Sequence, residues 1–275
     1  MFRMLRRAVV VLLLALPVPA LAQTPLERGR TLVEGIAACG NCHTPKGPQG
    51  DLPGMAFAGG LVIDEPNAFR AVTSNITPDP ETGIGRWTDA QIIRAIREGV
   101  RPDGRVLGPP MPFALYRDIS DRDATAIVAY LRSLRPVRNV VEASRYPMPL
   151  PPAYGPPLGT VAGPADTPIA RGAYLGGPLG HCIECHSPMG TGGQRDFTRA
   201  GTGGPPLNGP MGAIVPPAIN GPALRGWTDA QIERAIRQGV SSDGRRLAPP
   251  MAFPHYARIG GTEMRDLIAY LRSLP

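Results

Sequence analysis

The sequence has 275 residues, of which 43% are hydrophobic but only 5% aromatic, and its formal net charge is +7. This length fits two domains of ordinary size, and so few aromatic side chains favour a large bound cofactor as a further source of buried apolar surface. Three of the basic residues lie in the first 22 positions, so the rest of the chain has a net charge of +4 and lacks the dense basic stripe of a nucleic-acid-binding protein.

The sequence opens with the three parts of a secretory signal peptide. Arg3, Arg6 and Arg7 form a basic front, an apolar run covers residues 8–16, and Ala20-Leu21-Ala22 provides a small-residue cleavage site. The apolar run is too short to span a membrane, and no later segment is long and apolar enough to do so. We therefore expect cleavage after Ala22, export to the periplasm and no transmembrane anchor in the mature chain.

Residues 24–43 predict a short helix that leads into a cysteine motif. Thr24-Pro25-Leu26-Glu27 has the spacing of a capping box, with proline at the first helical position. The helix is expected to reach Cys39. The motif that follows, C-x-x-C-H, consists of Cys39, Cys42 and His43.

A second helix and a rigid loop are predicted further along. Thr88 and Gln91 form another capping box, and Gly99 is expected to end this helix. The loop has the pattern L-x-P-P-M-x-F and contains Met111, and a last helix starts near Ser120. We find no convincing alternating strands, so a mainly α fold with long proline- and glycine-rich loops is expected.

The whole pattern then recurs, which indicates a duplicated domain. The segment from Arg86 to Tyr116 aligns without a gap with Gly226 to Tyr256, at a constant offset of 140. The motif at Cys39 aligns with C-I-E-C-H at an offset of 143. Two copies of a unit this long are each domain-sized, which excludes a solenoid of short repeats.

Three parts are therefore expected in the mature chain. These are a first domain at residues 23–135, a linker at residues 136–168 and a second domain at residues 169–275. The linker contains nine prolines and only four charged residues. Such a composition favours an extended, semi-rigid spacer.

All four cysteines lie in the two C-x-x-C-H motifs, and this distribution separates the possible chemistries. A zinc site would bring its cysteine pairs much closer in sequence, and a thioredoxin-like pair would adjoin a β-α-β pattern that is missing. A structural disulfide fits an exported protein but leaves the histidine after both pairs unexplained. Haem attachment explains every position, because both thiols bond to the haem and the histidine coordinates the iron.

The sequence therefore predicts two covalently bound haem c groups. The expected attachment residues are Cys39, Cys42, Cys182 and Cys185, and the expected proximal iron ligands are His43 and His186. The first domain contains no other histidine, and only Met111 and Met251 fall at equivalent places among the methionines. Each of these methionines follows two prolines that restrict the backbone. Ligation by histidine and methionine raises the reduction potential and closes the iron to small molecules, which is the chemistry of an electron carrier.

Two further histidines break the symmetry of the repeat. His181 precedes the second motif, where the first copy has Ala38, and we interpret it as a local surface or packing residue. His255 lies four residues after Met251, where the first copy has Leu115. It is either a polar neighbour of the haem or an alternative distal ligand that lets the second haem switch ligation.

The motifs CGNCHTP, SNITPDPETGIGRWTD, RPDGR, PPMPF and AYLRSL resemble those of the cytochrome c subunits of bacterial alcohol, gluconate and aldehyde dehydrogenase complexes. The resemblance covers nearly all of the mature chain. It implies two tandem, mainly helical cytochrome c domains of the class I type, with His43 and Met111 on one iron and His186 and Met251 on the other. Those subunits typically carry three haem domains and a membrane-associating tail, whereas this sequence has two motifs and no such tail.

These expectations together describe a periplasmic dihaem cytochrome c. It is expected to carry electrons from a dehydrogenase to a downstream cytochrome or terminal oxidase, and not to be an enzyme itself. The alternative is a dihaem redox enzyme of the peroxidase or thiosulfate dehydrogenase type. Such an enzyme would need a second haem whose iron opens through a change of ligand.

Overall fold

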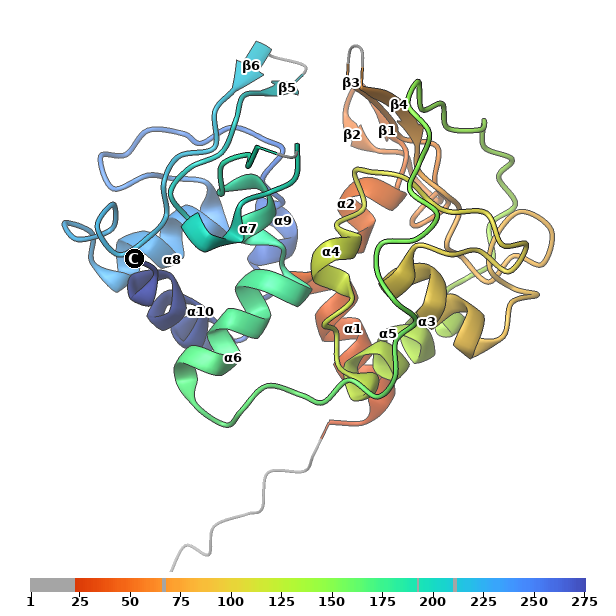
Figure 1. Ribbon diagram of the computed structural model, residues 1–275, viewed down its shortest axis with the longest axis horizontal. Helices are drawn as coiled ribbons and strands as arrows, with labels where there is room; N and C mark the ends of the chain where they lie inside the picture. Colours follow the sequence, from red (N-terminus) through yellow and green to blue (C-terminus); the bar gives the residue numbers. More distant parts are fainter. Residues whose placement is uncertain (1–22, 66–67, 192, 210–211) are drawn as a thin grey trace, which may run out of the picture.

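The computed structural model describes residues 23–275 except positions 66, 67, 192, 210 and 211 (Figure 1). The predicted signal peptide, residues 1–22, lies outside the described residues. Within them, no helix has both the length and the apolar character needed to cross a membrane.

The first domain is built from short helices and two small hairpins. Its helical elements are α1 (Pro25–Thr31), η1 (Leu32–Ile36), α2 (Cys39–His43), α3 (Asp89–Glu98), α4 (Phe113–Tyr116) and α5 (Asp121–Ser133). The antiparallel hairpins pair β1 (Lys46–Gly47) with β2 (Gly50–Asp51) and β3 (Val62–Glu65) with β4 (Phe69–Val72).

The second domain repeats this order. Its helical elements are α6 (Pro168–Tyr174), η2 (Leu175–Leu179), α7 (Cys182–Cys185), η3 (Phe197–Arg199), α8 (Asp229–Gln238), α9 (Phe253–Tyr256) and α10 (Gly261–Ser273). One antiparallel hairpin pairs β5 (Leu207–Gly209) with β6 (Gly212–Ile214). The prediction of a mainly α fold is confirmed. The hairpins were not predicted, because strands of two to four residues are too short to show an alternating pattern.

The predicted capping boxes are present. In α1, the Thr24 side chain accepts a hydrogen bond from the Glu27 amide, and the Glu27 carboxylate accepts one from the Thr24 amide. Thr88 with Gln91 and Thr228 with Gln231 do the same at the starts of α3 and α8. Both of these helices end at a glycine in the left-handed conformation, as the sequence predicts.

The first helix does not run unbroken to Cys39. It passes at Leu32 into a π-helical turn, and Gly35 in this turn has non-helical φ and ψ angles of −104° and −109°. Ala38 then adopts a left-handed conformation with φ of 47°, so that α2 starts in a new direction at Cys39. The motif is therefore carried on a short helix of its own.

The first and last helices of each domain cross in backbone contact. A Cβ atom added to Gly29 in α1 would lie 1.9 Å from the Ala126 carbonyl oxygen in α5. At the equivalent crossing of α6 and α10, a Cβ on Gly172 would lie 2.0 Å from the Asp266 carbonyl oxygen. Only glycine permits this approach, so these crossings specify how each domain closes.

Replacing Gly29 by alanine is therefore expected to lower the free energy of unfolding by about 3 kcal/mol, because α1 and α5 must move apart. Helix propensity alone predicts the opposite sign, since alanine favours a helix over glycine. Denaturant unfolding of the holoprotein measures the effect. The matched control is Gly163→Ala, because no atom lies within 4 Å of a Cβ at that position. If both variants lost the same free energy of unfolding, the close backbone contact between α1 and α5 would be contradicted.

The two domains share one hydrophobic cluster and exchange contacts across a pseudo-symmetric interface (Figure 1). Short helix α4 of the first domain packs on η2, and its counterpart α9 packs on η1. Polar groups reinforce this interface. The Tyr174 hydroxyl donates to Asp123 at 3.1 Å and accepts from the Ser120 amide at 3.0 Å, and Arg28 pairs with Glu263 at 2.6 Å.

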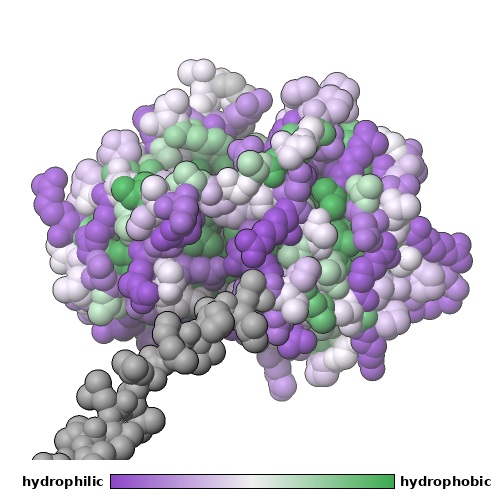
Figure 2. Space-filling view, turned by 90° about the horizontal axis from the view of Figure 1, so that it is seen from below, coloured by the Kyte–Doolittle hydropathy of each residue, from purple (hydrophilic) through white to green (hydrophobic). Residues whose placement is uncertain are grey.

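The linker packs against the first domain instead of crossing open solvent. Arg145 pairs with Arg70 of β4 through both backbone hydrogen bonds, and Asp121 of α5 exchanges hydrogen bonds with Val161. In Figure 1 the linker, drawn in green, runs down the first domain before it turns to α6. On the face of the molecule that is seen from below, hydrophobic residues are scattered among hydrophilic ones (Figure 2).

Candidate functional site

The cysteine motifs each place two free thiols on one short helix. Cys39 and Cys42 lie in α2, and Cys182 and Cys185 lie in α7. Residues three apart on a helix share a face, and no disulfide joins either pair; all four cysteine residues are half-buried. Burial among protein atoms raises the pKa of Cys39 and of Cys182 to about 12, so these thiols stay protonated at neutral pH.

The motif histidines are oriented by their backbone partners. Nδ1 of His43 lies 2.7 Å from the Ser74 carbonyl oxygen, and Nδ1 of His186 lies 2.7 Å from the Pro217 carbonyl oxygen. A carbonyl partner requires the proton on Nδ1, which leaves the lone pair on Nε2. Nε2 has no hydrogen-bond partner among the described residues for either ring. This is the arrangement of a metal-ligating histidine with its orienting partner in place.

The protonation of these histidines fits the same role. Burial lowers the pKa of His43 and of His186, so both imidazoles are neutral at physiological pH. A neutral imidazole is the form that binds iron. With the two adjacent free thiols, each motif therefore offers the donor set of a covalently attached haem.

The predicted distal ligands occupy equivalent loops. Met111 and Met251 are both partly buried and pack against the shared hydrophobic cluster, which Cys39 also contacts. The preceding Pro-Pro bonds are cis in both copies. Two other methionines of the second domain differ in burial, because Met264 is 1% exposed in the core and Met189 is 41% exposed.

Two buried tyrosines, each five residues after a predicted methionine ligand, lie near the cysteine motifs. They were not among the residues predicted from sequence. Tyr116 follows Met111 by five residues; burial raises its pKa, and the nearby Cys39 and Cys42 raise it further. Tyr256 stands in the same relation to the second motif. Each is 7% exposed. Their equivalent places at the end of the aligned L-x-P-P-M frames were the signal that could have identified them.

Both motifs border the domain interface. His181, which precedes Cys182, packs on Tyr116 of the first domain. Gly40, within the first motif, lies against His255 of the second domain. Each candidate site therefore has residues of the other domain among its neighbours.

The two symmetry-breaking histidines both contact the first domain. His181 packs edge-on against Tyr116, with ring centroids 5.9 Å apart, which agrees with its predicted packing role. His255 approaches the Glu34 carbonyl oxygen with Nδ1 at 3.1 Å, and its Cε1 would lie 3.2 Å from a Cβ on Gly40. His255 thus packs at the domain interface in this structure, against Gly40, the residue that follows Cys39.

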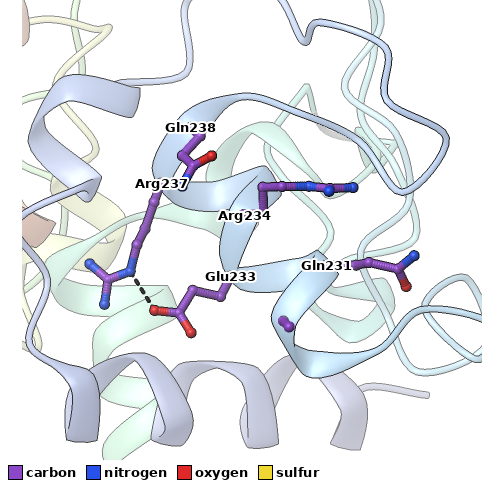
Figure 3. A pocket seen from close by; sticks show the side chains of 6 residues that line it. Gln231, Glu233, Arg234, Arg237 and Gln238 are labelled. Atoms are coloured by element: carbon purple, nitrogen blue, oxygen red, sulfur yellow. Dashed lines mark hydrogen bonds and ion pairs between the residues drawn. The ribbon is translucent and has the colours of Figure 1, made fainter.

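Two surface hollows of the described residues lie away from these sites. One hollow of about 380 Å³ is lined by residues of α8 alone, and two of its lining residues, Arg237 and Glu233, form an ion pair at 2.6 Å (Figure 3). Another lies on α3 beside Leu158 and Gly159 of the linker. Neither includes a predicted attachment residue or iron ligand.

The chain also resembles known proteins in sequence. The sequence profile of a family described as cytochrome c matches residues 26–135 and 170–275. The chain is 36% identical over 265 residues to one of the subunits of nicotinate dehydrogenase from Pseudomonas putida, covering 90% of this chain and 21% of the relative. It is 33% identical over 278 residues to the cytochrome c subunit of alcohol dehydrogenase (quinone) of Gluconacetobacter polyoxogenes, covering 91% and 54%.

A smaller relative is matched over most of its length. The diheme cytochrome c-type protein of Cereibacter sphaeroides is 29% identical over 248 residues, which cover 86% of this chain and 82% of the relative. By contrast, the chain spans about a fifth of the nicotinate dehydrogenase polypeptide and about half of the alcohol dehydrogenase polypeptide.

Proposed function

The chain belongs to the cytochrome c family, and from this premise we propose that it carries electrons from a dehydrogenase to a downstream cytochrome or terminal oxidase in the periplasm. The chain holds two haem c groups, one for each matched segment, and is an electron-transfer protein rather than an enzyme. When bound, each haem supplies an iron that alternates between the ferric and ferrous states.

The names of the relatives support a dehydrogenase as electron donor. They include cytochrome subunits of alcohol, fructose and gluconate dehydrogenases. Each of these relatives is longer than this chain, so the donor is proposed by class only. The basic, apolar and small-residue segments of residues 1–22 support export to the periplasm.

The observation that carries the proposal is the pairing of two equivalent sites across one interface. In each domain we propose attachment through the motif cysteines, with the motif histidine and the loop methionine as iron ligands. These ligands are His43 with Met111 and His186 with Met251. Because residues next to each motif contact the other domain, as His181 contacts Tyr116 and Gly40 contacts His255, an electron that enters one domain has a path to the other through the shared interface.

An absorption spectrum of the purified mature protein tests the proposal. We expect two haems per chain, both low-spin, with a methionine-sulfur charge-transfer band in the oxidised protein. We also expect no spectral change with carbon monoxide in the reduced protein, because a histidine and a methionine fill both axial positions of each iron.

The same spectrum separates the carrier from the alternative dihaem enzyme. An enzyme needs an iron that is open or opens readily, so a high-spin haem or ready binding of carbon monoxide would contradict the carrier. In that case, peroxidase and sulfur-compound oxidation assays would follow. Fewer than two haems in fully matured protein would contradict the proposed attachment residues.

A further inference from the structure

We propose that the linker acts as a latch that holds the Met111 loop closed, and that the Met251 loop, over which the described residues place no such cover, releases its methionine more readily. The latch comprises residues 144–161. This inference rests on the proposed ligation of iron by Met111 and Met251. It assigns the two haems different susceptibility to external ligands, although their ligand sets are the same.

Two tyrosines of the latch bond directly to the backbone that precedes Met111. The Tyr154 hydroxyl donates to the Leu107 carbonyl oxygen at 2.8 Å, and the Tyr146 hydroxyl donates to the Pro109 carbonyl oxygen at 3.0 Å. Prolines have no amide hydrogen, so hydrogen bonds to the backbone of this part of the loop are made mainly to its carbonyl oxygens.

The aromatic rings of the latch also pack around the loop. The Tyr154 ring lies against Phe113, with centroids 4.7 Å apart, and Phe113 is 1% exposed. A Cβ on Gly108 would lie 2.3 Å from Cζ of Tyr146, so this glycine leaves space for the ring. Residues on both sides of Met111 in the sequence therefore contact the latch.

The latch itself is anchored at both ends to the first domain. Near its start, the Ser144 hydroxyl accepts a hydrogen bond from the Val72 amide at 2.9 Å, and Arg145 pairs with Arg70. Near its end, the Asp121 amide donates to the Val161 carbonyl oxygen at 2.9 Å. The tyrosines therefore act from a fixed support and cannot move away without breaking these bonds.

In the second domain, the residues that the structure describes place no such cover over the equivalent loop. Among the described side chains, none donates a hydrogen bond to the carbonyl oxygen of Leu247 or Pro249, the counterparts of the two held carbonyls. Ala248 replaces Gly108 and is exposed, and Phe253 is partly exposed where Phe113 is buried. The hollow on α8 is likewise lined by α8 alone (Figure 3), whereas linker residues line its counterpart on α3.

Titration of the oxidised holoprotein with imidazole tests the latch. Imidazole replaces the methionine sulfur on iron without a change of oxidation state, so the charge-transfer band disappears as each methionine is displaced. We expect the band to disappear in two steps, with the second domain responding at a concentration about tenfold lower than the first. Loss of two hydrogen bonds from the loop accounts for a factor of this order.

The double variant Tyr146→Phe/Tyr154→Phe removes the two hydroxyl groups and keeps the rings. It is expected to move the first domain's step to about tenfold lower imidazole and to leave the other step in place. A Met251→His background isolates the band of the first domain and so assigns the steps. The matched control is Met148→Ala, a linker residue that is 73% exposed and lies between the tyrosines; it should move neither step.

Two results would overturn the latch, and they differ in what else they overturn. If the band is present but both methionines leave at the same concentration, or the tyrosine variant changes neither step, the latch is wrong and the proposed ligation stands. If the unmodified oxidised protein shows no methionine-sulfur band, the proposed ligation is wrong and the latch falls with it. A thermal melt of each variant by circular dichroism shows whether a shift arises from general unfolding.

Discussion

Replacing Cys182 and Cys185 together by serine is expected to yield a protein with one covalently bound haem instead of two. Serine hydroxyls are close in size to thiols but do not form the thioether bonds that hold haem c. The second domain should also become sensitive to protease, because a domain of this size with few aromatic residues loses the cofactor that completes its core. Haem per chain and the haem content of proteolytic fragments measure both effects.

The mirror variant Cys39→Ser/Cys42→Ser is the matched control, because it should spare the haem of the second domain and remove that of the first. Haem staining after denaturing electrophoresis of separated fragments assigns the remaining group to a domain. Retention of two covalent haems in either variant would show that these cysteines are not the attachment residues. Loss of both haems from one variant would show that the domains do not mature independently.

Replacing Met111 by histidine is expected to lower the reduction potential of one haem by on the order of 0.1 V and to remove about half of the methionine-sulfur band. Methionine favours the ferrous state relative to histidine, and axial ligands set haem potentials over a span of about 0.8 V. Met251→His should do the same to the other haem. A spectroelectrochemical titration resolves the two potentials.

Other methionines provide the controls for this prediction. Met55→Leu in the first domain and Met264→Leu in the second should change neither the band nor either potential by a comparable amount. Met264 is a stringent control, since it is 1% exposed in the core and its replacement perturbs packing without touching a predicted ligand. If Met55→Leu removed the band while Met111→His left it intact, the assignment from the repeated loops would be wrong.

Several features of this protein could be predicted from sequence because they depend on neighbouring residues. The capping boxes at Thr24, Thr88 and Thr228 form within single turns of helix, and their side-chain partners lie three residues away. The C-x-x-C-H motifs place their donors on short helical segments for the same reason. The tandem cytochrome c domains could likewise be predicted, because the same motifs occur in the same order in both halves of the chain.

Other features required the tertiary structure because they arise where the two copies and the linker meet. His255 hydrogen-bonds to Glu34, 221 residues away, and His181 packs on Tyr116 of the other domain. No local pattern distinguishes such a contact from solvent exposure or from iron ligation. The sequence likewise predicts a continuous first helix, because no proline marks the bend at Gly35.

The amino-acid sequence by itself determined the number of domains, the mainly helical fold and the kind of cofactor, because each is encoded in contiguous and repeated motifs. The tertiary structure alone decided that the two cysteine motifs border a common interface, and that the linker covers the Met111 loop. The physical reason is that both depend on which surfaces of the two domains and the linker bury each other. That choice is made by shape and hydrogen bonding between residues far apart in the chain, such as Tyr154 and Leu107 or His255 and Glu34.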